Sequence, residues 1–244
     1  MSNSGTHIPN KLKPLSVKTI FIAISGGVDS VVLLDLLSKN HSNIHLLHVN
    51  YHLRGEESNA DEQLIRKLAT KYTVSISVHN FDMGKHLSEN GGNLQNAARK
   101  IRYDFFSQNV CKDDVLMTAH HLDDQMETFF MHLTRKSGIA GMSCMAEKNG
   151  NHWRPLLGFR KSELYKYAKE NHLEFREDQS NSENKYLRNR WRNEWIPMME
   201  KANIQLAESV RVLVKAFQTE RGFLEKENQS TLNSIHESGV WSFS

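Results

Sequence analysis

The sequence predicts an α/β fold with an open, mostly parallel, doubly wound sheet and a helical C-terminal extension. Three observations support this prediction. Apolar strands alternate with amphipathic helices as far as residue 135, a polar glycine turn directly follows the first strand, and the chain beyond residue 137 is mainly helical in pattern. Strands that alternate with helices form right-handed βαβ units, which build a parallel sheet covered on both faces.

The alternation can be followed element by element. Residues 17–24 (VKTIFIAI) form a nearly continuous β-branched run, which is typical of a buried strand. Residues 57–71 carry four apolar side chains at helical spacing and predict an amphipathic helix. By the same criteria, the sequence predicts strands at 17–24, 43–49, 73–78 and 114–119 and helices at 30–38, 57–71, 93–110 and 121–135.

The chain after residue 137 changes in pattern. Residues 138–150 contain glycines and predict a connection, and 154–157 (RPLL) predicts a short extended segment. The remainder is predicted to be mostly helical. Leu213, Val214 and Phe217 are expected to form an apolar stripe that packs against the main domain or a partner.

Composition restricts the class of protein. Charged residues make up 24% and hydrophobic residues 39%, as in a soluble globular protein. No apolar run is long enough for a membrane span, and residues 1–16 lack the apolar block of a signal peptide. Cys111 and Cys144 form no CxxC pair or disulfide framework, so the reducing cytoplasm is the expected location. The net charge of +3 does not by itself indicate a polyanionic partner.

The turn SGGVDS (25–30) carries polar groups at the carboxyl end of the first strand, where open α/β sheets bind ligands. Its two glycines permit positive φ and close approach, so backbone N–H groups can converge on an anion. The hydroxyls of Ser25 and Ser30 can donate to phosphate oxygens, and Asp29 suits a magnesium ion bridging it to phosphate. A tight turn in which Asp29 or Ser30 caps the helix is the structural alternative.

Two common phosphate loops are excluded at this turn. A P-loop requires GxxxxGK[ST], whereas this segment has no lysine, and the dinucleotide pattern GxGxxG is also absent.

A second motif, HHLDDQMET (120–128), begins where the fourth predicted strand ends. On a helix, His120, Asp124 and Glu127 would share one face. Carboxylates there could bind magnesium, and a histidine could move a proton or contact a phosphate. The zinc-protease spacing HExxH is absent. The structural alternative is a solvated helix start with acidic residues.

Two further segments are basic. Arg99 and Arg102 lie three residues apart on a predicted helix, and permanently charged, forked guanidinium groups suit polyphosphate. KYLRNRWR (185–192) carries four cations and two aromatic residues. A solvated helix face with buried aromatic side chains is the alternative interpretation of that octamer.

Five segments, taken in order, resemble one family. They are SGGVDS; HVNYHLRGEES with a following Asp61; NLQNAARKIRY; TAHHLDDQMETFFMHLTRKSGIAGMSCM; and RPLL followed by EDQSNSENKYLRNRWR. They run from about Thr19 to Pro197 and are similar to the tRNA(Ile) lysidine synthetases, a branch of the PP-loop ATP pyrophosphatases. The resemblance implies a PP-loop, adenine nucleotide alpha hydrolase-like fold of Rossmann type.

The resemblance also implies a reaction. Lysine would be ligated to C2 of the wobble cytidine in the CAU anticodon of tRNA(Ile), through an adenylated cytidine, giving lysidine, AMP and pyrophosphate. The C2 oxygen is a poor leaving group until it carries AMP, and the ε-amine of lysine must lose a proton before it attacks. The implied cofactors are ATP and Mg²⁺, and the implied partners are this tRNA and free lysine, with no membrane.

Site residues follow from the same resemblance. The implied ATP-binding residues are Ser25, Gly26, Gly27, Val28, Asp29, Ser30 and Arg99. The implied catalytic residues are Asp29, His120, Asp124, Glu127 and Arg188, and the implied magnesium ligands are Asp29 and Asp124. The implied tRNA-binding residues are Arg188, Arg192, Tyr186 and Trp191, the last two packing or stacking on RNA. Glu127 would orient the lysine ammonium, His120 would handle phosphate or a proton, and Arg102 would be structural.

We expect three regions: a flexible leader (1–16), a PP-loop ATPase catalytic domain (17–200), and a helical extension (201–244). Longer family members continue into a tRNA-binding C-terminal domain, and a short form and a truncated chain both stay open. The sequence leaves open whether the protein forms a homodimer. The family often has a small residue where His121 stands. Two rival functions remain: a PP-loop tRNA thiolase, for which no cysteine pair is present, and a non-catalytic nucleotide- or RNA-binding remnant.

Overall fold

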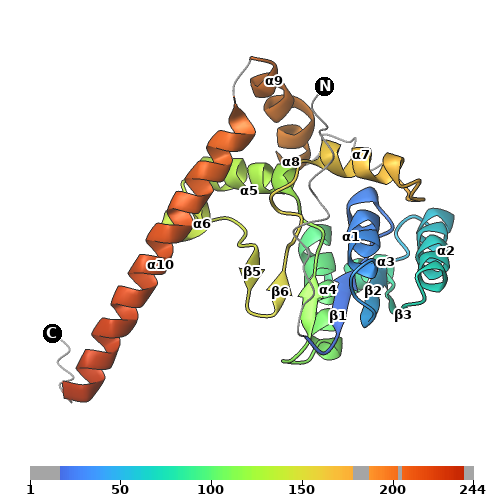
Figure 1. Cartoon of the computed structure of the whole chain (residues 1–244), viewed down its shortest axis with the longest axis horizontal. Helices are drawn as coiled ribbons and strands as arrows, with labels where there is room; N and C mark the ends of the chain where they lie inside the picture. The colour runs from blue at the N-terminus through green and yellow to red at the C-terminus, as the bar shows by residue number, and fades with distance from the viewer. Residues whose placement is uncertain (1–16, 178–186, 203–204, 239–244) are drawn as a thin grey trace. The chain divides into compact units, whose positions relative to one another are not determined.

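The computed structural model of the protein describes residues 17–177, 187–202 and 205–238, with side chains described up to Ser230. Figure 1 labels its elements. The strands are β1 (Ile20–Ala23), β2 (Ile44–Asn50), β3 (Ser75–Asn80), β4 (Val115–Met117), β5 (Lys148–Asn149) and β6 (His152–Trp153). The helices are α1 (Val28–Ser38), α2 (Glu56–Lys71), α3 (Met83–Asn90), α4 (Leu94–Asn109), α5 (Leu122–Thr134), α6 (Ile139–Met142), α7 (Lys161–Glu170), α8 (Leu187–Arg190), the π-helical turn η3 (Trp191–Trp195), α9 (Ile196–Lys201) and α10 (Leu206–Ser238).

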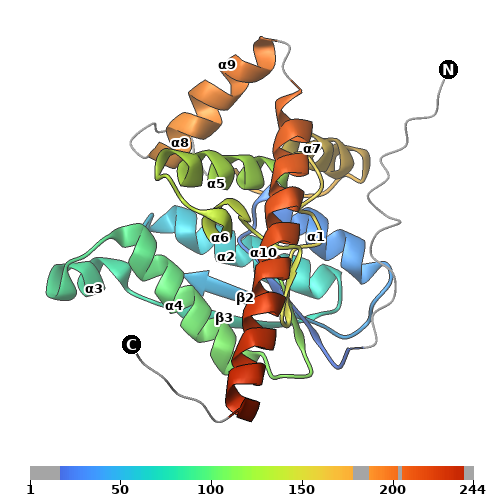
Figure 2. The ribbon, with the colours of Figure 1, turned by 90° about the vertical axis from the view of Figure 1, so that its left-hand side faces the viewer.

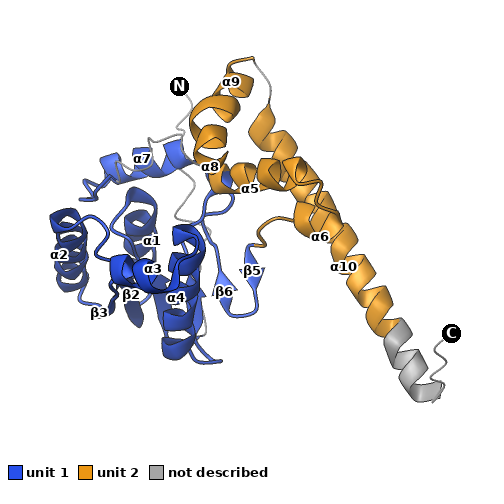
Figure 3. Cartoon of the chain, turned by 180° about the vertical axis from the view of Figure 1, so that it is seen from behind, with its two compact units in different colours: residues 1–122, 147–179 blue, residues 123–146, 180–244 orange. Residues whose placement is uncertain are grey.

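The chain divides into two compact units, which Figure 3 colours separately. Unit 1 comprises residues 1–122 and 147–179, and unit 2 comprises residues 123–146 and 180–244. The region 17–200, predicted as one catalytic domain, therefore contributes to both units, and its boundaries stay a prediction. The predicted leader (1–16) lies outside the described residues.

Unit 1 contains a six-stranded sheet in the order β3-β2-β1-β4-β6-β5. The first five strands in this order run parallel, and β5 joins the edge antiparallel to β6. The predicted open, mostly parallel sheet is confirmed. β1 lies inside the sheet, and its backbone is hydrogen-bonded to β2 on one side and to β4 on the other. In a parallel sheet of this kind, both faces of such a strand must be covered by other elements.

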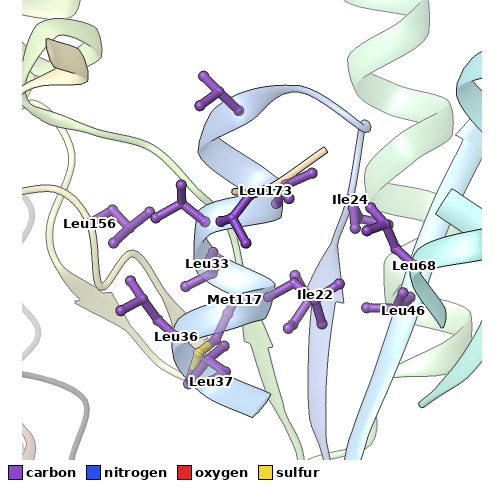
Figure 4. Packing of buried hydrophobic residues seen from close by; sticks show 14 of the residues in the cluster. Ile22, Ile24, Leu33, Leu36, Leu37, Leu46, Leu68, Met117, Leu156 and Leu173 are labelled. Carbon is purple, nitrogen blue, oxygen red and sulfur yellow. The ribbon is translucent and has the colours of Figure 1, made fainter. Parts of the chain in front are cut away.

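Alternate side chains of β1 enter two different cores, as the two-residue period of a strand requires. Ile20, Ile22 and Ile24 belong to the larger core, which α1, α2 and α7 cover. Figure 4 shows Ile22 among labelled neighbours from other elements of that core. Phe21 faces the smaller core with Phe106 of α4, so helices cover both faces of the sheet (Figure 2).

Three elements of unit 1 differ from the sequence prediction. Helix α3 was not predicted, because only Met83 in it is buried and it therefore lacks an apolar stripe. Its start is set by Asp82, whose side chain accepts a hydrogen bond from the Lys85 N–H (2.9 Å). The β5–β6 hairpin has strands of two residues, too short to leave a periodic pattern. The prediction of an extended segment at 154–157 was wrong, since the strand ends at Trp153 and turns follow.

Within unit 2, α10 buries a stripe that was only partly predicted. Leu206, Val210 and Val214 are buried at a spacing of four residues, which keeps them on one helix face. Leu213, predicted on this stripe, is exposed, because it lies one residue out of that spacing. The side chain of Gln218 donates to the carbonyl oxygens of Ser143 and Met145, so α10 packs beside α6. Across the part of the chain that is described, none of the helices combines the length and hydrophobicity needed to cross a membrane.

The central position of β1 makes Ile22 a sensitive test of the fold. Ile22 is fully buried, so Ile22→Ala should lower the free energy of unfolding by about 2–5 kcal/mol through lost burial and a cavity. Urea denaturation followed by circular dichroism measures this change. Leu224→Ala in α10 is the control, because Leu224 is exposed and its truncation should change stability by less than about 0.5 kcal/mol. Equal effects of the two substitutions would contradict the described core.

Candidate functional site

The loop between β1 and α1 is held by hydrogen bonds among its own residues. The Ser30 hydroxyl accepts from the Ser25 N–H (3.2 Å) and donates to the Gly27 carbonyl (3.0 Å). The Ser25 hydroxyl accepts from the Gly27 N–H (3.4 Å). The structure therefore brings the two serines and Gly27 together in one tight turn at the carboxyl end of β1. No side chain caps α1, so the interpretation of Asp29 or Ser30 as a helix cap is not supported.

The two glycines of this loop have different roles. Gly26 has φ +84°, a conformation that residues with a Cβ rarely adopt. Gly27 has an ordinary φ of −73°, and a Cβ there would lie 3.5 Å from the Ser25 hydroxyl oxygen, an ordinary contact. Only Gly26 is therefore required by backbone conformation. Val28 is buried in the larger core, which leaves its backbone rather than its side chain to contact a ligand.

Asp29 lies in the first turn of α1 with one oxygen near two basic side chains of unit 1. Its Oδ2 lies 3.6 Å from Nε2 of the buried His121 and 4.0 Å from Nζ of Lys161, the first residue of α7. Its Oδ1 is buried and has no hydrogen-bond partner among the described residues. A buried carboxylate oxygen without a partner is costly unless a ligand satisfies it. Among the described residues, Asp29 therefore keeps one carboxylate oxygen that a ligand could satisfy.

A magnesium ion fits this arrangement of Asp29. Mg²⁺ prefers oxygen ligands and is usually held by one or two carboxylates together with substrate phosphates and water. Within the described ranges, no group of three or more histidine, cysteine, aspartate or glutamate side chains is placed to hold a metal ion. Among the described residues, Asp29 could therefore contribute one ligand to such an ion but does not belong to a complete metal site.

In unit 2, α5 presents Asp124 and Glu127 to two arginines. Nε of Arg188 donates to Glu127 Oε2 (2.6 Å), and Nε of Arg192 donates to Glu127 Oε1 (2.5 Å). Nη2 of each arginine also reaches Asp124 Oδ1, at 3.1 and 3.3 Å respectively. Glu127 is fully buried, whereas the side chain of Arg188 is 41% exposed. We call Asp124, Glu127, Arg188 and Arg192 the arginine–carboxylate cluster.

The π-helical turn η3 supports this cluster with aromatic packing. The Trp191 ring stacks on Phe130 of α5, with ring centres 4.7 Å apart, and meets Trp195 edge-on at 4.5 Å. Trp191 was predicted either to pack within the protein or to stack on RNA, and its described contacts are packing contacts. Tyr186, the other aromatic residue predicted to contact RNA, lies outside the described residues. π-helical turns occur frequently at functional sites, and this one includes Arg192.

His120 was predicted to share a helix face with Asp124 and Glu127, and this placement was wrong. Helix α5 begins at Leu122, where the Leu122 N–H bonds the Phe159 carbonyl (2.8 Å), so His120 precedes the helix. Its Nδ1 lies 2.8 Å from Thr118 Oγ1, and the same hydroxyl lies 2.9 Å from His152 Nε2. His120 thus belongs to a hydrogen-bonded group at the end of β4.

The two arginines of α4 make different contacts. Arg99 is exposed and its guanidinium lies over the ring of Tyr103, 4.8 Å from the ring centre. Nε of Arg102 donates to the Tyr51 hydroxyl (3.4 Å), which in turn donates to the Ala98 carbonyl (2.7 Å). The contacts of Arg102 agree with the structural role predicted for it. The predicted contact between Arg99 and ATP is not tested by these contacts and stays a prediction.

Sequence reasoning missed His121, Lys161 and Arg176. Arg176 joins the Gly26 turn, since its N–H donates to the Gly26 carbonyl (3.0 Å) and its Nε donates to Asp61 (2.5 Å). Arg54 binds the other oxygen of Asp61 (2.8 Å). The motif HVNYHLRGEES contains Arg54 and is followed by Asp61, so the sequence had indicated these two residues but not Arg176. Nothing in the spacing of His121 or Lys161 indicates that either lies near Asp29.

Comparison with known proteins assigns the family. A PP-loop domain matches residues 2–199, most of the chain. The chain belongs to the PP-loop family. Among solved structures, the U34-tRNA thiolase NcsA from Methanococcus maripaludis has a TM-score of 0.65 and 19% sequence identity, and the match covers 88% of this chain and 76% of that one. At this identity the likeness supports the fold of the PP-loop protein described here and nothing further.

Relatives of this PP-loop protein bear out the resemblance predicted from its motifs. A tRNA(Ile)-lysidine synthase from Bacteroides thetaiotaomicron is 35% identical over 193 residues, covering 78% of this chain and 45% of the relative. The tRNA(Ile)-lysidine synthases of Geobacter sulfurreducens and Enterococcus faecalis are 38% and 34% identical, over 75% and 90% of this chain. The chain spans about half the length of the curated relatives it matches.

The buried position of His152 predicts a pH dependence of stability. Burial, with added repulsion from Arg154, His120 and Arg99, lowers the pKa of His152 to about 4. An unfolded histidine binds a proton near pH 6.5, so between these two values the unfolded chain holds more protons and stability falls as pH falls. The loss from pH 7 to pH 5 should be about 2 kcal/mol larger in the wild type than in His152→Gln. Urea denaturation at both pH values measures it, and equal losses would contradict the shift.

The arginine–carboxylate cluster predicts that Arg192 stabilises unit 2. Arg192→Met leaves the buried Glu127 with one arginine and should lower the free energy of unfolding by about 1–3 kcal/mol. Hydrogen exchange of the α5 amides, together with the urea midpoint, reports this loss. The matched control is Arg221→Met, which removes an exposed arginine–glutamate pair (Arg221 to Glu225, 2.7 Å) and should cost less than about 0.5 kcal/mol. Faster exchange in the control alone would show that the cluster does not stabilise α5.

Proposed function

We propose that this protein ligates lysine to C2 of the wobble cytidine in the CAU anticodon of tRNA(Ile), with ATP as the source of activation. The observation that carries this proposal is the arrangement of the SGGVDS loop, in which Gly26 adopts a positive φ and Asp29 keeps a buried, unbonded oxygen. The similarity to tRNA(Ile)-lysidine synthases over most of the chain supports the choice of substrate.

In the first stage, the cytidine C2 oxygen attacks the α-phosphorus of ATP, and the bond from that phosphorus to the β-phosphate oxygen breaks. AMP becomes attached to the cytidine, and pyrophosphate leaves. The loop suits this step because it leads into the N-terminus of α1, whose first-turn N–H groups and partial positive charge favour bound phosphate. A bound magnesium ion, with Asp29 as a ligand, would supply charge neutralisation of the phosphates. That Asp124 shares the same ion stays a prediction from the sequence.

In the second stage, the ε-amine of lysine attacks C2, and AMP leaves with the oxygen. The lysine ammonium must lose a proton first, so a carboxylate beside it is useful both for orientation and for holding the charge. Glu127 is our candidate for this role, because its buried carboxylate already binds cationic groups, the guanidinium groups of Arg188 and Arg192.

The tRNA is the expected polyanionic partner. Arg188 is the more exposed of the two arginines bound to Glu127, and it is our candidate for contact with the reacting cytidine, with Arg192 as a second contact. The base must leave its stack to react, as in other enzymes that modify bases. A reducing cytoplasmic location agrees with the free thiols of Cys111 and Cys144.

The rival tRNA thiolase function is less well supported by the cysteines. The chain has two cysteines, which are 33 positions apart and form no CxxC pair. Burial raises the pKa of the Cys144 thiol to about 11, which disfavours the thiolate that sulfur transfer requires.

A lysine-incorporation assay tests the proposed function. The protein is incubated with ATP, Mg²⁺, radiolabelled lysine and an unmodified tRNA(Ile) bearing CAU, and label in the tRNA and released pyrophosphate are both measured. We expect both products, with pyrophosphate formation reduced on the order of 100-fold in Asp29→Asn. Asp104→Asn is the control, because Asp104 is an exposed residue of α4. Wild-type protein that forms neither product would refute the ligase function, and an Asp29→Asn variant of normal activity would refute the role of Asp29.

A further inference from the structure

The segment 173–177, which follows α7, carries a backbone donor to the SGGVDS loop. Leu173 is buried in the larger core, and Phe175 packs against the same core. Between these anchors and the loop, Nε of Arg176 binds Oδ1 of Asp61 on α2 (2.5 Å). The segment is therefore fixed to the core and to α2 at the point where it meets the loop.

The Arg176 backbone sets the orientation of one peptide group in the loop. The Gly26 carbonyl accepts a hydrogen bond from the Arg176 N–H (3.0 Å), and the Gly27 N–H of the same peptide donates to the Ser25 hydroxyl (3.4 Å). The C=O and N–H of a trans peptide point in opposite directions. The carbonyl oxygen thus faces Arg176, and the N–H faces Ser25, which is predicted to bind phosphate.

Glycine on both sides of this peptide makes the reverse orientation accessible. Reversing a peptide rotates ψ of the residue before it and φ of the residue after it by about 180°. The φ of Gly27 would change from −73° to a strongly positive value, which glycine adopts readily and other residues rarely. The reversed peptide would turn the partly negative Gly26 oxygen toward the Ser25 hydroxyl, where it would repel an anion.

Asp61 holds Arg176 in the place that prevents this reversal. Its Oδ1 accepts from Nε of Arg176, and its Oδ2 accepts from Nη2 of Arg54 (2.8 Å). The side chain of Asp61 is 15% exposed and that of Arg176 is 41% exposed, so the carboxylate is the better-fixed partner. Hydrogen bonds between a guanidinium and a carboxylate are stronger than those between neutral groups. Asp61 therefore anchors Arg176 beside Gly26.

We propose that Asp61 and Arg176 are positioning residues that hold the Gly26–Gly27 peptide with its carbonyl oxygen turned away from the phosphates of ATP. This inference rests on the proposed function, in which the SGGVDS loop binds ATP, and deepens it by naming groups outside the loop that keep it ready for an anion. Both residues act through the peptide rather than on the substrate. Their loss lowers the population of the competent loop and weakens ATP binding by the same factor.

The first experiment reads the hydrogen bond itself and does not depend on activity. In protein labelled with ¹⁵N-arginine, the backbone signal that is lost in Arg176→Lys belongs to Arg176 and reports the exchange of its amide hydrogen. We expect exchange about tenfold faster in Asp61→Asn. Adding Gly27→Ala should slow it again, because alanine disfavours the reversed peptide and its Cβ would lie 3.5 Å from Ser25 Oγ, an ordinary contact. An unchanged rate in Asp61→Asn, or no slowing with Gly27→Ala, would overturn the proposal.

The second experiment measures ATP binding by calorimetry, with Mg²⁺ and without tRNA, and pyrophosphate release with tRNA. Asp61→Asn and Arg176→Gln should each raise Kd and KM for ATP about tenfold with little change in kcat, because saturating ATP restores the competent loop. Circular dichroism checks that each variant is folded. The matched control is Lys67→Met, which breaks an exposed ion pair between α2 and the same segment (Lys67 to Glu174, 2.6 Å) and should leave Kd unchanged.

The outcomes separate the positioning role from the proposed function. A normal Kd in both Asp61→Asn and Arg176→Gln, or an equal rise in Lys67→Met, would overturn the role of Asp61 and Arg176. If the wild-type protein bound no ATP, the proposed function would fail, while the amide exchange of Arg176 would still decide the orientation of the peptide.

Discussion

Parallel pairing on both sides of β1 is the constraint on which unit 1 depends. β1 is paired on both edges and covered by helices on both faces, and its four residues (IFIA) are all apolar, so the polar groups of the candidate site lie beyond the ends of strands. The SGGVDS loop follows β1, and Thr118 with His120 follows the neighbouring strand β4. The sheet that makes the core therefore also decides where the chemistry can lie.

Much of this arrangement could be predicted from sequence, because long apolar runs and helical stripes carry a strong periodic signal. The run at 17–24 and the stripe of α2 both led to elements that the structure contains. The polar helix α3 and the two-residue strands of the β5–β6 hairpin have no such signal. Leu213 was misplaced because a shift of one residue changes the helix face on which a side chain lies, and His120 was misplaced because α5 begins only at Leu122.

The candidate site was predicted in its residue types and only partly in its contacts. Spacing correctly put Asp124 and Glu127 on one face of α5, and it contained no information that Arg188 and Arg192 both bind them. Similarly, Asp29 was recognised from its motif, whereas His121 and Lys161 approach it through packing of unit 1 that no local pattern records. Contacts between distant segments depend on how the sheet and helices pack, which is why they emerged only from the structure.

The two arginines on Glu127 have a consequence for any cation that binds there. A buried carboxylate that is already neutralised cannot gain a full new ion pair; it can only exchange one partner for another. The affinity for an incoming ammonium group is then the difference between two similar interactions, so it is modest even though each ion pair is short. An exchange of this kind favours release as readily as capture, which would suit the role proposed for Glu127 of holding lysine for a single turnover.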